Sequence, residues 1–269
     1  MSVITISRGT FSGGKMLAEC LARRLGYRCI DRDVIVERAA AHGVSQNELR
    51  AALEKPPTFL ERFKHRKYLY LVLIQAALAE EVRTGKAIYH GLAGHLLLRG
   101  GTPVLRTRII APIDFRIRMA QERLKLSRDD AIEYIEKMDH DRRRWTQYLY
   151  GVDWNDPSLY DVVINLEYVN IEQACRAITT LIRDRCFSFT PECQAMMNDL
   201  ALASRVRAAL ALDHRTSHLE FDVESRNGAV TVKGRLPDVD QLPELEKIVL
   251  GVPGVTALNT DELAPATQA

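Results

Sequence analysis

The sequence predicts an α/β domain with a parallel sheet flanked by helices over residues 1–190, followed by a small α+β domain over residues 196–265. In the first domain, a short β-branched run at residues 3–6 leads into a glycine-rich loop and then a helical pattern, the order that begins a parallel sheet. Near residue 190 the charge changes sign. Residues 1–190 carry 30 Lys and Arg against 23 Asp and Glu, or +7, whereas residues 191–269 carry 7 against 12, or −5. In the second domain, Asn227-Gly228 between two alternating apolar runs is typical of a β-hairpin.

Composition excludes several classes of protein. The 269 residues are 46% hydrophobic and 27% charged, which is ordinary for a globular chain. No apolar run approaches the roughly 20 residues that span a bilayer, and the N-terminus lacks the basic and apolar regions of a signal peptide. The five cysteines form no C-x-x-C pair, and their odd number argues against a closed disulfide framework. We therefore expect a cytoplasmic protein with reduced thiols.

The elements of the first domain follow from short β-branched runs and from apolar residues at helical spacing. Leu17, Leu21 and Leu25 lie on one face of a predicted helix, and Gly26 follows as its C-cap. The predicted strands comprise residues 3–6, 27–30, 87–89, 104–110 and 161–165. The predicted helices comprise residues 16–25, most of 34–84, 114–124, 127–150 and 171–185.

Within residues 34–84 the helical pattern is interrupted. Ser45 and Glu48 have the spacing of a capping box, so one helix begins there. Pro56-Pro57 breaks the pattern, and a long helix over residues 60–83 follows.

The pattern lapses again at residues 187–191, and the elements of the second domain come after it. They are a helix at 199–212, strands at 219–224 and 229–233, a helix at 242–250 and a strand at 255–259. About 70 residues are near the small end of independently folding domains.

The glycine-rich loop matches the pattern G-x-x-x-x-G-K over residues 9–15. It directly follows a predicted buried strand and directly opens a helix, where backbone N–H groups and the helix N-terminus can face one anion. Lys15 would reach the outer phosphates of a nucleotide as a point charge. The predicted phosphate-binding residues are Gly9, Thr10, Ser12, Gly13, Gly14 and Lys15.

The position after the lysine departs from this pattern. Ser or Thr normally holds Mg²⁺ there, but this chain has Met16, and a thioether is a poor ligand for a hard cation. Mg²⁺ would therefore be held through waters and other groups, with Ser12, Asp31 and Asp33 as candidates, or metal handling is impaired.

Several motifs in order resemble the cytidylate kinase-like family of P-loop nucleoside monophosphate kinases, over roughly residues 1–185. The N-terminal landmarks are Ile4-Thr5-Ile6-Ser7-Arg8, Ser12-Gly13-Gly14, Gly26-Tyr27 and Asp31-Arg32-Asp33-Val34-Ile35. The later landmarks are Asp139, Arg142, Tyr150-Gly151, Trp154, Asp156-Pro157, Tyr160-Asp161 and Ile164-Asn165. The resemblance implies a P-loop kinase-type sheet and transfer of the γ-phosphoryl group of ATP, with Mg²⁺, to a CMP-like acceptor.

The same resemblance implies roles for particular side chains. Arginine suits phosphoryl transfer because its fork binds phosphate oxygens bidentately. The implied catalytic residues are Lys15, Arg116, Arg123 and Arg142, of which Arg116 and Arg123 resemble the arginines of the family's lid. The implied acceptor-binding residues are Asp31, Arg32, Asp33 and Asp139.

A second departure lies at residues 91–94. The family typically has Gly-Arg-Gly there, and the arginine expected to bind the acceptor phosphate is Leu92 in this chain. His90, His95 or Arg99 could take its place.

Residues of the second domain resemble a BON domain. The resemblance rests on Val206, Leu210, Gly228-x-Val230-x-Val232-x-Gly234 and Gly251-Val252-Pro253-Gly254-Val255. It implies contact with proteins or with phospholipid surfaces through residues 196–265. The charge of −5 disfavours binding to anionic lipid, so a protein-contact or regulatory role is the preferred reading.

Two rival functions are considered beside an ATP-dependent nucleoside monophosphate kinase. Met16 and Leu92 favour a catalytically degenerate, nucleotide-sensing adaptor that acts through its second domain. Arg142-Arg143-Arg144 beside Trp145 would suit nucleic-acid binding, but phosphate handling in a small-molecule site explains these charges better. The sequence predicts neither the acceptor base nor the oligomeric state.

Overall fold

The large domain is built on a sheet of five parallel strands. The computed structural model describes residues 2–54, 64–91, 93–98 and 104–265. The strands are β1 (Val3–Arg8), β2 (Arg28–Asp31), β3 (Ala87–His90), β4 (Val104–Ile110) and β5 (Val162–Asn165). Their order in the sheet is β2-β3-β1-β4-β5, and every neighbouring pair is parallel. The predicted α/β fold with a parallel sheet is confirmed.

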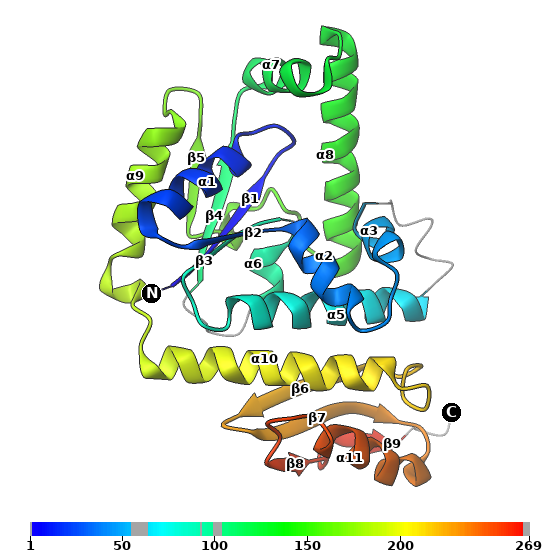
Figure 1. Ribbon diagram of the computed structural model, residues 1–269. Coiled ribbons are helices and arrows are strands. Elements are labelled where there is room, and N and C mark those ends of the chain that lie inside the picture. The colour runs from blue at the N-terminus through cyan, green and yellow to red at the C-terminus, as the bar shows by residue number, and fades with distance from the viewer. Residues whose placement is uncertain (1, 55–63, 92, 99–103, 266–269) are drawn as a thin grey trace.

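Helices cover both faces of this sheet (Figure 1). Because side chains alternate along a strand, Ile4 packs on one face with α1 (Gly14–Leu25) and α9 (Ile171–Ile182), and Val3 packs on the other. The second face carries α2 (Arg32–Ala40), α3 (Gln46–Glu54), α5 (Lys64–Val82) and α6 (Gly94–Leu97). The sheet is therefore buried on both sides, as expected for parallel strands.

Two further helices form a hairpin beside the ends of the strands. They are α7 (Ile113–Leu124) and α8 (Arg128–Tyr150), and Figure 1 shows α8 running from the hairpin tip down to α5. The hairpin has a small core of its own around Ile117 and Ile135, against which Phe11 of the glycine-rich loop packs. The loop and the hairpin are thus joined by apolar contact.

The small domain combines two helices with a mixed sheet, which confirms the predicted α+β class. Its elements are α10 (Pro191–Leu212), β6 (Phe221–Arg226), β7 (Ala229–Leu236), α11 (Leu242–Leu250), β8 (Ala257–Asn259) and β9 (Leu263–Pro265). β6 and β7 are antiparallel, whereas β8 and β9 pair parallel with β7. The hairpin turn lies at Asn227 and Gly228, whose φ angles of 52° and 87° are the left-handed values that such a turn requires.

Short 3-10 helices connect these elements. They are η2 (Pro157–Leu159), η3 (Arg185–Phe187) and η4 (Val239–Gln241). No helix in the described ranges is both long and apolar enough to cross a membrane.

The structure corrects one predicted element and adds two that were not predicted. The helix predicted from residue 199 begins at Pro191, where the Thr190 hydroxyl accepts a hydrogen bond from the Cys193 N–H. It was missed because α10 is apolar on several sides and lacks a clear helical period. The sequence also did not predict α6 or β9. The start of the long helix at residue 60 lies outside the described residues.

Candidate functional site

The glycine-rich loop, residues 9–15, is shaped by two close approaches. A Cβ on Gly14 would lie 2.2 Å from Cδ of Arg8, and a Cβ on Gly9 would lie 2.7 Å from Oγ of Ser12. Gly13 is the N-cap of α1 and has a φ of 84°. Glycine is needed at these positions because a side chain would collide with the loop or with Arg8, or would be strained.

Lys15 and Thr10 offer groups to a ligand at this loop. The Lys15 side chain is 54% exposed and pairs with Glu19 at 3.9 Å. The Thr10 hydroxyl is buried and has no hydrogen-bond partner among the described residues. No acidic residue occupies the first turn of α1, so its N-terminus keeps the positive potential that attracts anions.

Asp139 on α8 connects the loop to the α7–α8 hairpin. Its Oδ1 accepts a hydrogen bond of 2.9 Å from the Thr10 N–H, and its Oδ2 accepts one from Arg116. Nε of Arg116 donates to the Thr10 carbonyl at 2.7 Å. Arg142 lies 3.9 Å from Asp139 and donates to the carbonyl of Arg8 at 3.4 Å. One carboxylate therefore serves two arginines and one backbone amide.

Two cavities meet at this loop. The small cavity has a volume of about 160 Å³ and the large cavity about 400 Å³. The small cavity is lined by Arg8, Thr10, Phe11, Gly13, Gly14, Lys15, Met119, Arg123, Tyr134, Met138 and Arg142. The large cavity is lined by Ser7, Arg8, Lys15, Asp31, Arg32, Asp33, His90, Gly91, Ala93, His95, Tyr134, Met138, Asp141, Arg142, Trp145, Thr146 and Trp154. Lys15, Arg8 and Arg142 thus face both.

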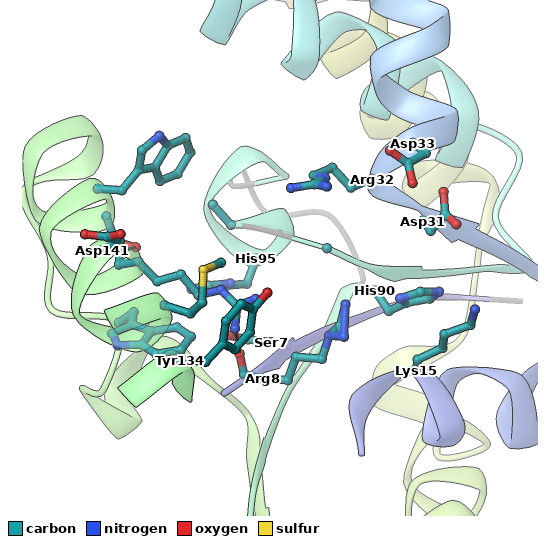
Figure 2. Close-up of a pocket in the computed structure, with 17 residues that line it drawn as sticks. Ser7, Arg8, Lys15, Asp31, Arg32, Asp33, His90, His95, Tyr134 and Asp141 are labelled. Atoms are coloured by element: carbon teal, nitrogen blue, oxygen red, sulfur yellow. Dashed lines mark hydrogen bonds between the residues drawn. The ribbon is translucent and has the colours of Figure 1, made fainter. Parts of the chain in front are cut away.

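The large cavity has two unlike walls. Figure 2 shows Asp31, Asp33, His90 and Lys15 on one side, with Tyr134 and Asp141 on α8 opposite. The α8 wall also carries Trp145. The cavity therefore offers polar and charged groups at one end, and aromatic surface beside Asp141 at the other.

Trp154 also lines the large cavity and is held in place by Arg108. Arg108 on β4 is buried, donates hydrogen bonds to the carbonyl of Trp154 and to Oδ1 of Asn155, and lies over the Trp154 ring at 4.6 Å. Nε1 of Trp154 is buried without a hydrogen-bond partner among the described residues. The indole N–H is thus an unused donor at a residue that lines the large cavity.

Positive charge is crowded between the two cavities. Burial, together with the neighbouring Arg8, lowers the pKa of Arg142 to about 10. The pKa of Arg8 is also lowered, first by burial and then by Arg123 and Arg32. Burial beside Arg8 lowers the pKa of His90 to about 4, so His90 is neutral near pH 7. These cations destabilise one another unless an anion lies among them.

The structure brings most of the predicted site residues together. Of the predicted loop residues, Thr10, Gly13, Gly14 and Lys15 line one or both cavities, whereas Gly9 and Ser12 line neither. Arg123, Arg142, Asp31, Arg32 and Asp33 also line one or both cavities. Arg116 and Asp139 lie against the loop instead and line neither cavity. His90 and His95 line the large cavity. Leu92 and Arg99 lie outside the described residues. Which of these groups take part in catalysis or binding stays a prediction.

Sequence reasoning missed Arg8, Tyr134 and Trp145 as residues of the site. Arg8 is the last residue of β1, directly before the loop, and this position is the signal that could have found it. Tyr134 and Trp145 lie on α8, far from the loop in the chain, and no local pattern marks them.

The residues present do not form a preassembled Mg²⁺ site. Met16 follows Lys15, Oδ1 of Asp31 accepts a hydrogen bond from the Val34 N–H, and Asp33 pairs with Arg50 at 3.4 Å. The described residues contain no group of three or more His, Cys, Asp or Glu side chains that could hold a metal ion. Mg²⁺ coordination by Ser12, Asp31 or Asp33 stays a prediction.

Known proteins resemble the chain in two separate ranges. The model of the cytidylate kinase-like family matches residues 3–168, and the model of the BON domain matches residues 198–264. A cytidylate kinase of Methanothrix thermoacetophila is 30% identical over 165 residues, which cover 61% of this chain and 87% of that protein. A cytidylate kinase of Methanosarcina mazei is 30% identical over 171 residues, covering 62% and 88%.

A solved structure extends the likeness to the fold. The crystal structure of an uncharacterized protein from Eubacterium ventriosum matches with a TM-score of 0.55 at 16% identity, and covers 69% of this chain and 100% of the other. At this identity the match concerns the fold alone. Because the first family model spans more than half of its residues, the chain belongs to the cytidylate kinase-like family, and a BON domain follows the kinase-like domain.

Proposed function

We propose that this protein transfers the γ-phosphoryl group of ATP to a nucleoside monophosphate, with a CMP-like molecule as acceptor. The observation that carries the proposal is the convergence of a glycine-rich loop, Lys15 and crowded arginines at the meeting point of two cavities. Both substrates are polyanions, and together they supply the negative charge that this cluster of cations lacks. Family membership supports the same reaction class.

The small cavity, beside Lys15 and the α1 N-terminus, suits the phosphates of ATP. The buried Thr10 hydroxyl and the backbone of the loop offer hydrogen bonds there. The large cavity suits the acceptor, since Arg32 can bind its phosphate and the aromatic wall can contact its base. The transferred group would then pass between Lys15, Arg8 and Arg142, which face both cavities.

Catalysis in this arrangement is mainly electrostatic. The bond between the γ-phosphorus and the bridging oxygen of ADP breaks as a phosphate oxygen of the acceptor bonds to the same phosphorus. Lys15, Arg123 and Arg142 stabilise the charge that is spread over the transferring oxygens. Asp139 positions Arg142 and, with Arg116, holds the loop. Neutral His90 removes no proton, because the acceptor oxygen is already ionised near pH 7.

The family implies a divalent cation, which supplies charge neutralisation on the phosphates of ATP when it is bound. In this chain Ser12, Asp31 and Asp33 remain its candidate ligands. Because Met16 replaces the usual hydroxyl, weaker dependence on Mg²⁺ for ATP binding is expected than for a site with a Ser or Thr ligand.

A screen of the common nucleoside monophosphates with ATP and Mg²⁺, with ADP as the readout, tests the proposal. We expect turnover with at least one acceptor, most strongly with CMP. ATP binding without phosphorylation of any monophosphate would overturn it.

Met16 favours a second candidate, a nucleotide-sensing adaptor that acts through the BON domain on a protein or a phospholipid surface. Calorimetry with ATP separates the two functions. Binding that is unaffected by Mg²⁺, without turnover, supports the adaptor, whereas Mg²⁺-dependent binding with turnover supports the kinase.

A further inference from the structure

The two domains share one helix. Met197 and Ala208 of α10 pack in the core of the large domain, whereas Leu202, Val206 and Leu210 pack in the core of the small domain. Figure 1 shows α10 lying between α5 and the small sheet. The small domain is therefore seated on the large domain through a buried helix face rather than tethered by a loop.

The edge strand of the small sheet is also bound at this junction. The Tyr68 hydroxyl, on α5, donates to the carbonyl of Phe221 at 2.7 Å and accepts from the Phe221 N–H at 3.1 Å. Arg207, on α10, donates to the carbonyl of Val223 at 3.2 Å. Backbone groups of a strand edge that would otherwise be unpaired thus bind side chains of α5 and α10.

A chain of hydrogen bonds leads from this edge into the large domain. Arg207 is fixed to the small sheet by its ion pair with Asp222, at 2.5 Å. Its Nη1 donates to Oε1 of Gln75 on α5 at 3.0 Å, and Nε2 of Gln75 donates to the carbonyl of Leu97 at 3.0 Å. The Gln75 amide therefore connects the BON domain to the C-terminal end of α6.

α6 forms part of the wall of the large cavity. Ala93, its N-cap, and His95, in its single turn, both line that cavity. A Cβ on Gly94 would lie 2.3 Å from the ring of Tyr89, so α6 packs directly on the end of β3. A helix of four residues is too short to be stable alone. Its position depends on tertiary contacts, and the bond from Gln75 is one of them.

We infer that Arg207 of the BON domain is a positioning residue for the acceptor site. It acts on α6 by way of Gln75, which lies on α5. The inference rests on the proposed function, because it assigns the large cavity to the acceptor. The BON domain then helps to support the acceptor site. Loss of the hydrogen bond between Arg207 and Gln75 therefore weakens acceptor binding and leaves ATP binding unchanged.

The test compares four variants of the full chain: Arg207→Gln, Gln75→Leu, the double variant and Arg205→Gln. Arg205 is the matched control because it lies on the same helix but is directed to the small domain, where a Cβ on Gly254 would lie 3.5 Å from its Nη2. We expect KM for CMP to rise about 2- to 30-fold in Arg207→Gln and in Gln75→Leu, with KM for ATP and kcat unchanged. KM for CMP in the double variant should be no higher than in the more severe single variant, since both single substitutions break the same series of hydrogen bonds.

Two further readouts do not require turnover. Both tryptophans of the chain, Trp145 and Trp154, line the large cavity, so their fluorescence reports CMP binding directly. Amide hydrogen exchange of residues 94–98 reports the order of α6. We expect weaker CMP binding and faster exchange in Arg207→Gln and Gln75→Leu, and neither change in Arg205→Gln.

The outcomes separate this inference from the proposed function. If the wild-type chain phosphorylates no monophosphate, the proposed function fails, and exchange at residues 94–98 still decides whether Arg207 supports α6. If Arg207→Gln resembles Arg205→Gln in KM for CMP and in exchange, the inference is wrong. It is also wrong if KM for ATP rises as much as KM for CMP, since that indicates general loss of structure.

Discussion

The two domains treat charge in opposite ways. In the small domain, Arg207, Arg215 and Lys233 are matched by nearby carboxylates. The pairs are Arg215 with Asp213 and Glu244, Lys233 with Glu224 and Glu262, and Arg207 with Asp222. Where the two cavities of the large domain meet, Arg8 pairs with no carboxylate of the described residues, and Arg142 shares Asp139 with Arg116. Local imbalance of charge, rather than the net charge of a domain, therefore distinguishes the candidate ligand site from the small domain.

The pKa values of arginines shift in opposite directions in the two domains. The lowered pKa values of Arg8 and Arg142 show that the large domain holds these cations at a cost. In the small domain the raised pKa of Arg215 shows the reverse, since its carboxylate partners stabilise the charge. Binding of an anion should therefore stabilise the large domain and have little effect on the small domain.

The largest expected effect comes from removing Lys15, the cation of the glycine-rich loop. Lys15→Ala should lower kcat/KM at least about 100-fold, because Lys15 would stabilise charge on the transferring phosphoryl group. Its side chain is 54% exposed, so the fold should not change. Steady-state kinetics and circular dichroism check both statements. Lys137→Ala, an exposed lysine on α8, is the control, and near wild-type activity in Lys15→Ala would contradict the assignment.

Asp139→Asn removes the negative charge that pairs with Arg116 and Arg142. The carboxylate balances Arg116 and Arg142 and accepts from the Thr10 N–H, and an amide cannot replace its charge. The free energy of unfolding should fall by about 2–4 kcal/mol, measured by chemical denaturation. ATP should restore more stability to this variant than to the wild type. Glu136→Gln, an exposed carboxylate on the same helix, should change neither quantity.

A smaller effect is expected where the two domains meet. Tyr68→Phe removes both hydrogen bonds to the backbone of Phe221 while keeping the ring. The free energy of unfolding should fall by about 1–3 kcal/mol, because two backbone groups at the edge of β6 lose a partner. Thermal unfolding measures the change. Tyr168→Phe is the matched control, since Tyr168 is 90% exposed, and equal stability of the two variants would argue against the docking contact.

The sequence predicted the parts of the molecule that depend on local patterns. Strand, glycine-rich loop and helix follow each other within residues 3–25, and the Asn227-Gly228 turn needs only its two residues. The contact of Asp139 with the Thr10 N–H joins residues 129 positions apart, and no local pattern encodes it. The start of α10 was missed for a related reason. A helix buried between two cores has no single apolar face to mark it.

The smallest expected effect concerns acid and the ion pairs of the small domain. Hydrogen bonds from Arg215 hold the pKa of the Asp213 carboxyl well below its usual value. A carboxyl with a lowered pKa in the folded state stabilises the fold fully above its ordinary pKa of 3.8, and this contribution is lost as the pH falls further. Asp213→Asn should therefore be slightly less stable than the wild type at pH 7, and the difference should shrink below pH of about 4.

Solvent exposure limits the size of this effect. The side chains of Asp213 and Arg215 are 21% and 35% exposed, so water and salt weaken their attraction. Urea midpoints measured from pH 7 to pH 2 give the comparison, with Asp261→Asn, an exposed carboxylate of the same domain, as the control. A difference between Asp213→Asn and wild type that stays constant with pH would mean that Asp213 acts by shape and hydrogen bonding rather than by charge. The Asp213–Arg215 ion pair would then not stabilise the small domain through charge. The contrast between the two domains would rest on Arg8 and Arg142, between the two cavities, alone.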